Sequence, residues 1–186
     1  SLRLFSENGY DAVSVAEIAS AVGIKAPSLY KHYKSKRDIF DSILKKMSEA
    51  DSFYADENDM PNADDDYINV PLESIKRFSA AMFKHWTEDD FAARFRRMLS
   101  LERFKNYEMA DLYKSYISSG PLDYMKEVFA GMNYSENDAG QLALSFYGPM
   151  FMLYTVYDES ENKKEIISQA EKHINNFIDN LKEKSL

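Results

Sequence analysis

Apolar side chains recur along most of this chain with the period of an α-helix. Between residues 15 and 22 they stand at positions i, i+3, i+4 and i+7, which form one face of a helix. The segments 39–47 and 166–181 carry similar one-sided stripes. No segment shows the sustained apolar–polar alternation that is typical of a strand. The pattern therefore predicts an all-α fold.

Longer helices are expected in the rest of the chain. We predict them over Val70–Trp86, Glu88–Lys105, Met109–Phe129 with an interruption at Gly120-Pro121, Ser135–Tyr157 and Asn162–Lys184. The stretch from Asp51 to Asp66 is rich in acidic residues around Pro61 and predicts a mobile connection. Its spacing lacks the central Gly and the terminal Glu of a calcium-binding loop, so we expect no calcium site there.

The residues at helix ends divide the first part of the chain clearly. Asn8-Gly9 predicts the end of a first helix. Ser14 and Glu17 have the spacing of a capping box, in which each side chain satisfies a free backbone N–H at the start of a helix. Gly23 follows this second helix, and a residue that can take a positive φ lets the chain turn sharply there.

A third, short helix is predicted from Ala26-Pro27 to Tyr33, because Pro is favourable at the first helical position. Ser35 and Asp38 are the expected capping pair of a longer fourth helix. Helix 14–22, the turn at Gly23 and helix 26–33 have the order of a helix-turn-helix, in which two short helices cross steeply on a third.

This arrangement requires small and apolar residues inside and polar ones outside. Ala19 is small enough for a close approach of the next helix, and we expect Ile24, Leu29 and Tyr33 to fill the core. The remaining side chains point outward: Ala26, Pro27, Ser28, Tyr30, Lys31 and His32. Such a face suits the major groove of DNA.

The charges are unevenly distributed along the chain, with a basic N-terminal part and an acidic remainder. The net charge is −8, which alone argues against nucleic acid as a partner. Residues 1–50, however, hold eight Lys or Arg and six Asp or Glu, a net of +2, whereas the remainder holds 15 and 25, a net of −10. Between Lys25 and Arg37 there are five cations and no acid. A local basic patch on an acidic body can bind phosphates while the body limits non-specific binding.

The N-terminal segment resembles the TetR family of bacterial regulators. The resemblance extends over about 40 residues and rests on Leu4-Phe5-x-Glu7-x-Gly9-Tyr10, Ser14-Val15-x-x-Ile18-Ala19, Val22-Gly23-Ile24 and Leu29-Tyr30-x-His32-Tyr33-x-x-Lys36. Beyond this quarter of the chain, only the length and the helical character agree. The resemblance implies a dimeric transcription factor, usually a repressor, that leaves its operator when a small molecule binds its C-terminal domain.

The resemblance also implies roles for individual residues. Ser14, Tyr30 and Lys36 match positions that contact DNA phosphates, and His32 matches a position of either kind. The positions that read bases are Lys25, Ala26, Pro27, Ser28 and Lys31. Because Lys can donate to O6 and N7 of guanine, we expect at least one G in each half-site.

Two domains are expected, a helix-turn-helix domain over residues 1–47 and a helical ligand-binding and dimerisation domain over 48–186. Aromatic residues and Met are plentiful in the second, and such residues line adaptable apolar pockets as well as ordinary cores. The candidate pocket residues are Phe83, Trp86, Phe95, Met98, Phe104, Tyr113, Phe146 and Met150. The identity of the small-molecule effector cannot be inferred from them.

A homodimer is expected through helices 135–157 and 162–184. The second half of helix 135–157 is apolar nearly all round, and helix 162–184 has a stripe of its own. Together they suggest a four-helix interface with a second copy. Two recognition helices related by a two-fold axis would then require a palindromic site in double-stranded DNA.

An enzyme is the main alternative class. The chain has no Cys, and His32, His85 and His173 are too scattered for a catalytic triad or a zinc site. His85 and Glu88 lie one turn apart, but without further carboxylates at helical spacing we expect them at the surface. We therefore expect no enzymatic activity, cofactor or metal. A ligand-independent DNA-binding or chromosome-associated protein of the same fold stays open as a second alternative.

The expected location is the cytoplasm. The longest apolar run, residues 148–157, is far shorter than the roughly 20 residues that span a bilayer. We see no secretory leader, and the absence of Cys fits a reducing compartment.

Overall fold

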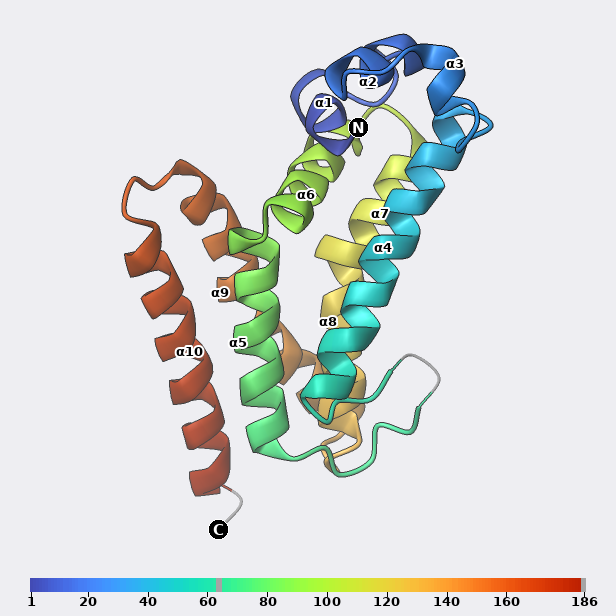
Figure 1. Ribbon diagram of the computed structural model, residues 1–186. Coiled ribbons are helices and arrows are strands. Elements are labelled where there is room, and N and C mark those ends of the chain that lie inside the picture. Colours follow the sequence, from blue (N-terminus) through green and yellow to red (C-terminus); the bar gives the residue numbers. More distant parts are fainter. Residues whose placement is uncertain (63–64, 185–186) are drawn as a thin grey trace. The chain divides into compact units, whose positions relative to one another are not determined.

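The computed structural model describes residues 1–62 and 65–184 and confirms the all-α prediction (Figure 1). Its helices are α1 (Leu2–Asn8), α2 (Val15–Ala21), α3 (Ala26–Leu29), α4 (Lys36–Glu57), α5 (Leu72–Glu88), α6 (Asp90–Glu102), α7 (Tyr107–Ile117), α8 (Ser119–Ala130), α9 (Glu136–Glu159) and α10 (Lys163–Lys184). Among the described residues, no helix combines the length and the apolar character needed to cross a membrane.

The chain forms two compact units that alternate along the sequence. The first contains Ser1–Asp51 and Asp90–Tyr113, and the second contains Ser52–Asp89 and the chain from Lys114 onward. This grouping differs from the expected division near residue 47, because α6 and the start of α7 pack with the N-terminal helices. The expected division into two functional domains, over residues 1–47 and 48–186, stays a prediction.

The core of the first unit is built around aromatic rings from α1 and α4. Phe5 and Phe40 are fully buried, and their ring centroids lie 6.5 Å apart with an edge-on geometry. Tyr10 closes the group, at 5.1 Å from Phe5 and 4.9 Å from Phe40. The contact between Phe5 and Phe40 thus holds α1 against α4.

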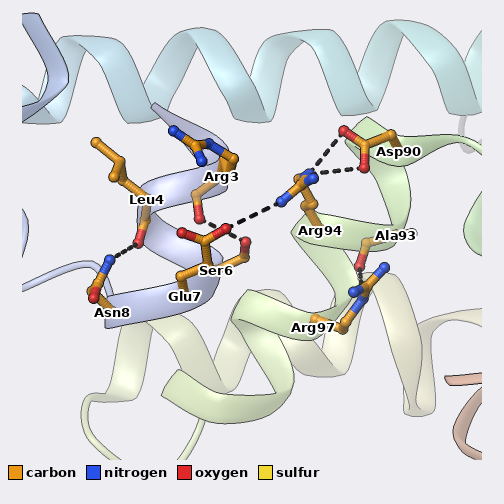
Figure 2. A network of polar contacts seen from close by, with 9 residues as sticks. All are labelled: Arg3, Leu4, Ser6, Glu7, Asn8, Asp90, Ala93, Arg94 and Arg97. Carbon is orange, nitrogen blue, oxygen red and sulfur yellow. Dashed lines mark hydrogen bonds and ion pairs between the residues drawn. The ribbon is translucent and has the colours of Figure 1, made fainter. Parts of the chain in front are cut away.

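Helix α6 packs against α1 on another side of the first unit. Figure 2 shows Arg94 of α6 between two carboxylates, with Nε 2.8 Å from Oδ2 of Asp90 and Nη1 3.7 Å from Oε1 of Glu7. The end of α1 also lies close to α6, because a Cβ added to Gly9 would lie 2.6 Å from Oε1 of Glu102. Gly9 has a φ of +87°, a conformation that favours glycine.

The second unit buries one face of each of its long helices. α9 packs against α8 and α10, and α10 packs against α5. Phe146 of α9 lies between Phe129 at 6.1 Å and Phe177 at 4.8 Å, measured between ring centroids. At the surface, Nζ of Lys84 lies 2.6 Å from Oε1 of Glu171, and Lys182 pairs with Glu73. These ion pairs join α5 to α10.

The acidic stretch after residue 50 differs from its prediction as a mobile connection. α4 continues as helix to Glu57. It ends with Asp59 at a φ of 54°, where the N–H of Asp59 bonds to Asp56 O and that of Met60 bonds to Ala55 O. This closes the helix end in the way that glycine usually does, with Asp in the left-handed conformation. The part of the prediction that falls on residues 63 and 64 lies outside the described residues.

The other long helices match their predictions to within a few residues. The interruption expected at Gly120-Pro121 occurs at Ser118, where φ is −111° and ψ is −94°. Pro121 then lies in the first turn of α8, and a residue there needs no N–H partner within the helix. The expected cap of α9 is confirmed, since Ser135 Oγ accepts a hydrogen bond from Asp138 N–H at 3.2 Å.

Candidate nucleic-acid interface

Helix α2 begins with the capping box that the sequence predicts. Ser14 Oγ accepts a hydrogen bond from the Glu17 N–H at 3.2 Å, and Glu17 Oε2 accepts one from the Ser14 N–H at 2.7 Å. The bond from the Ser14 N–H and a second one, which the Ser14 hydroxyl donates to Glu17 Oε2 at 2.7 Å, lower the pKa of the Glu17 carboxyl, because they stabilise its charged form. The seven-residue helix therefore has a well-defined start.

The turn between α2 and α3 is closed by two backbone hydrogen bonds. The N–H of Gly23 donates to Ser20 O at 3.0 Å, and the N–H of Ile24 donates to Ala19 O at 3.0 Å. This pair of bonds is the Schellman motif, in which the residue after the helix takes the left-handed conformation. Gly23 does so with a φ of +73°. The turn sets the direction in which α3 leaves.

Helix α3 is shorter than the predicted helix 26–33. The α-helix covers Ala26–Leu29, with Pro27 in its first turn. The chain then continues as a tight turn, in which the N–H groups of His32 and Tyr33 both donate to Leu29 O at 3.0 Å. The segment 26–33 is thus one compact coiled element, and Leu29 anchors it from below with 8% exposure.

The outward side of this segment consists of residues that the sequence assigned to DNA. Lys25, Pro27, Tyr30, Lys31 and His32 are exposed, and Tyr30 retains 52% of its surface. Ala26 and Ser28 are half-buried. Because no acidic residue lies between Lys25 and Arg37, this side offers donors, hydroxyls and small apolar groups to a partner.

The basic residues of this stretch fall into two groups. Within the described part of the chain, the side chains of Lys25, Lys31 and Lys34 have no carboxylate partner. Lys36 is held, since its Nζ donates to Tyr10 O at 2.9 Å and Asp11 O at 3.2 Å and lies 4.5 Å from the centre of the Tyr10 ring. This ammonium joins the α1–α2 connection to α4.

Arg37 is also held. Its Nε lies 2.7 Å from Oδ1 of Asp41, and its Nη1 lies 2.5 Å from Oε1 of Glu108. The two carboxylates raise the pKa of Arg37 and occupy both sides of its guanidinium. Arg37 is therefore less available to phosphates than the lysines before it, which are not paired with carboxylates among the residues that the structure describes.

Comparison with known proteins identifies this N-terminal element. Residues 1–43 match the family described as bacterial regulatory proteins, tetR family. The N-terminal segment is thus similar to the TetR family. Curated relatives match part of the chain. The biofilm operon icaADBC HTH-type negative transcriptional regulator IcaR of Staphylococcus aureus (strain Newman) is 46% identical over 44 residues, 24% of each chain.

A second relative extends the similarity. Tetracycline repressor protein class A from transposon 1721 of Escherichia coli is 26% identical over 84 residues, which are 45% of this chain and 37% of the repressor. The matched segments thus cover less than two fifths of the length of these curated relatives.

Solved structures agree with the TetR-family fold along nearly the whole chain. The fatty acid degradation regulator FadR from Bacillus halodurans superposes with a TM-score of 0.65 at 16% identity, over 95% of this chain and 90% of that one. A TetR-family transcriptional regulator from Marinobacter aquaeolei VT8 gives 0.63 at 18% identity, over 98% and 93%. At these identities the likeness concerns the fold.

Three apolar residues of the TetR-family domain are less buried than the sequence suggested. Val22 is 58% exposed because α2 ends at Ala21, so the helical stripe no longer applies one residue later. Ile24 is 40% exposed and takes part in the turn through its backbone rather than by filling the core. Tyr33 is half-buried.

One core residue escaped the prediction. Val13 is 3% exposed and stands directly before the cap Ser14, while Ile18, four residues into α2, is 2% exposed. These are the two positions of a hydrophobic staple, which often accompanies a capping box. The cap itself could have signalled this residue.

The expected pocket residues lie in both compact units, and whether they form a pocket stays a prediction. Phe104 is 82% exposed, whereas the others are buried: Phe83, Trp86, Phe95, Met98, Tyr113, Phe146 and Met150. A groove of about 290 Å³ is lined instead by residues of α5 and α10, among them Lys76, Arg77 and Asn175. Within the described ranges, no three His, Asp or Glu side chains gather as they would around a metal ion.

Proposed function

We propose that this protein is a transcriptional regulator of the TetR family that binds a palindromic operator in double-stranded DNA. The observation that carries the proposal is the acid-free side of the segment 25–34, set by the Gly23 turn and presented within a TetR-family domain. Unpaired ammonium groups beside small side chains are suited to phosphates and base edges. The relatives named as repressors or negative regulators favour repression.

The proposed contacts divide into two sets. Lys25, Ala26, Pro27, Ser28 and Lys31 face the bases, and Ser14, Tyr30 and Lys36 contact phosphates, with His32 able to serve either set. The exposure of Tyr30 supports its assignment. The Nζ of Lys36 already binds two carbonyls, so we assign it the additional task of positioning the loop that leads into α2.

We propose that the active form is a homodimer joined through α9 and α10. Leu144 and Met152 of α9 are large apolar residues that are 53% and 59% exposed, and Phe151 beside them is 37% exposed. A second copy would bury them in a four-helix interface. Leu144→Lys should then shift sedimentation velocity profiles from dimer to monomer, and an unchanged dimer would exclude this face.

The second unit is proposed to bind a small-molecule effector that releases the operator. A ligand can shift the equilibrium between two arrangements of the DNA-binding domains only if it binds one of them more tightly. A bacterial regulator of this kind works in the cytoplasm, where the DNA is. We infer no catalytic role, because the relatives are regulators.

Selection of bound sequences from random double-stranded DNA tests the proposal. The full chain should enrich one palindrome whose half-sites are centred about 34–36 Å apart, and each half-site should contain a G. Enrichment of no sequence, or of a single non-repeated half-site by a protein that sediments as a dimer, would contradict it. Binding should also weaken steeply with added salt, as expected for contacts with phosphates.

A further inference from the structure

His85 of α5 is a buried polar side chain that the proposed DNA contacts leave unexplained. It is only 8% exposed, and its Nε2 is buried without a hydrogen-bond partner in the described part of the chain. Such groups are rare in folded proteins, because a buried polar atom without a partner loses its hydrogen bonds to water and gains none in exchange. The surface position expected for this residue is therefore wrong, since α5 turns it inward.

The surroundings of His85 favour the uncharged form of its imidazole. Burial lowers its pKa, and the nearby charge of Asp89 opposes this effect without outweighing it. A neutral imidazole has one nitrogen that donates and one that accepts, and either can be Nε2. The best partner is a group that can do both, which a hydroxyl does.

Tyr54 and Trp86 of the second unit lie against this imidazole, and Tyr116 lies against Trp86. The ring centroid of Tyr54 lies 4.8 Å from that of His85, and the centroid of Trp86 lies at 5.7 Å. Tyr116 follows at 6.2 Å from Trp86. Tyr54 and Tyr116 are half-buried, so the group reaches from the interior to the surface. Rings at these distances are in contact with one another, and a flat, aromatic guest can pack against the half-buried rings of Tyr54 and Tyr116.

The charge of Asp89 and the burial of His85 disfavour an anionic guest. Burial penalises any charge that lacks a partner of the opposite sign. Asp89, whose field already acts on His85, repels an anion further. The guest that we infer is uncharged, planar and apolar over most of its surface, with one hydroxyl for the orphan nitrogen.

We propose that His85, together with Tyr54, Trp86 and Tyr116, forms a binding site for an uncharged phenol-like molecule. His85 Nε2 forms a hydrogen bond with its hydroxyl, and the three rings bind its aromatic body. The inference rests on the proposed function in one respect, since this molecule would be the effector that releases DNA.

The single Trp of the chain provides the readout. Trp86 gives the only indole N–H signal in a ¹H–¹⁵N spectrum of the full-length protein. Titration with 4-chlorophenol should shift this signal to saturation, and the affinity should be about tenfold higher than for chlorobenzene, which lacks the hydroxyl. 4-Chlorobenzoate, an anion with the same ring, should not saturate the site. Absence of a saturable shift with 4-chlorophenol would overturn the proposal.

Two variants at position 85 separate the hydrogen bond from packing. His85→Phe keeps a ring but removes the nitrogen, and it should bind 4-chlorophenol and chlorobenzene alike. His85→Gln keeps a polar group and should retain part of the preference. The matched control is His173→Phe, because Nε2 of His173 already lies 2.7 Å from Phe146 O. This variant should keep the full preference, and a preference that survives in His85→Phe would refute the assignment.

A DNA-binding measurement distinguishes this inference from the proposed function. Saturating 4-chlorophenol should weaken binding to the selected palindrome, and His85→Phe should reduce that effect. If the phenol binds through His85 and DNA affinity stays constant, the site is supported and release by an effector at this site is refuted. If a palindrome is enriched but the indole signal does not shift, the DNA-binding proposal holds and the His85 site is refuted.

Discussion

The helices of the DNA-binding element and those of the C-terminal part are stabilised in different ways. α1, α2 and α3 have seven, seven and four residues, whereas α9 and α10 have 24 and 22. A short helix leaves most of its end groups without intrahelical partners, so it depends on caps and turns. A long helix depends on the apolar face that it buries. Local chemistry should therefore matter more in the N-terminal element.

The two regions also differ in whether their lysines are paired with carboxylates. Lys31 has no carboxylate partner in the described part of the chain, whereas Lys84 of α5 pairs with Glu171 of α10 at 2.6 Å. A cation without a partner near a binding face is available to a phosphate or a base, and a paired one is not. The difference indicates which basic residues serve binding and which serve the fold.

The largest expected effect is a change of charge at these two lysines. Lys31→Glu should lower the affinity for the selected palindrome about 100-fold, because it removes a donor and places a carboxylate beside phosphates. Lys84→Glu breaks a surface ion pair of small energetic value and should change DNA affinity less than about twofold. Fluorescence anisotropy at one fixed salt concentration measures both. Equal losses would mean that the distinction between the two kinds of cation is wrong.

Glycine substitutions probe the turn against the long helix. Gly23→Ala should lower the free energy of unfolding by about 1–2 kcal/mol, because alanine is strained at a φ of +73°. Gly140→Ala in α9 meets open space and should raise it by up to about 1 kcal/mol through helix propensity. Urea unfolding at several protein concentrations checks both values. A neutral Gly23→Ala would show that the turn does not require the left-handed conformation.

The same contrast explains how much of the structure could be predicted. The Ser14 cap, the Gly23 turn and the Ser135 cap are local codes of three or four residues, and the structure confirms each of them. The helix end at Asp59 was missed because Asp takes the left-handed conformation there, where the sequence offers no glycine. Local patterns therefore locate helix starts well and unusual ends poorly.

Long-range contacts could not be predicted from sequence. The packing of α6 on α1 joins residues about 90 positions apart, and neither the stripe of α6 nor the salt bridge from Arg94 to Glu7 names its partner in advance. The bonds from Lys36 to the carbonyls of Tyr10 and Asp11 are of the same kind. In the candidate site, the residue types and the exposure of Tyr30 followed from the sequence. The exposure of Val22 and Ile24, and the partners of each lysine side chain, required coordinates.

Removal of a cap should have a smaller effect that again separates the regions. Ser14→Ala and Ser135→Ala each remove a hydroxyl that accepts from the third helical N–H at 3.2 Å, and each should cost about 1 kcal/mol. The local consequence differs with helix length. Hydrogen exchange of the α2 amides should accelerate along the whole helix, whereas that of α9 should accelerate only in its first turn. Uniform acceleration along α9 would contradict this account.

The smallest effect concerns two exposed carboxylates whose pKa values are lowered for different reasons. Hydrogen bonds from Ser14 lower the pKa of Glu17, and the ammonium of Lys182 lowers that of Glu73 through a hydrogen bond and its charge. Since both folded-state pKa values lie below the model-peptide value of 4.5, the stabilisation is complete above that pH and is lost as pH falls through the folded values. Both contributions therefore vanish in acid.

Salt should distinguish the two carboxylates. About 1 M NaCl shortens the screening length to about 3 Å, so the pKa of Glu73 should rise toward its ordinary value. The pKa of Glu17 should stay low, because its hydrogen bonds come from uncharged groups at the start of its own helix. NMR titration of the side-chain carboxyls measures both values. Ser14→Ala should raise the pKa of Glu17 only part of the way, because the N–H of residue 14 still donates to this carboxylate, and it should leave the pKa of Glu73 unchanged. If salt raised the pKa of Glu17 as much as that of Glu73, the charge of a distant cation, and not the cap, would be the cause.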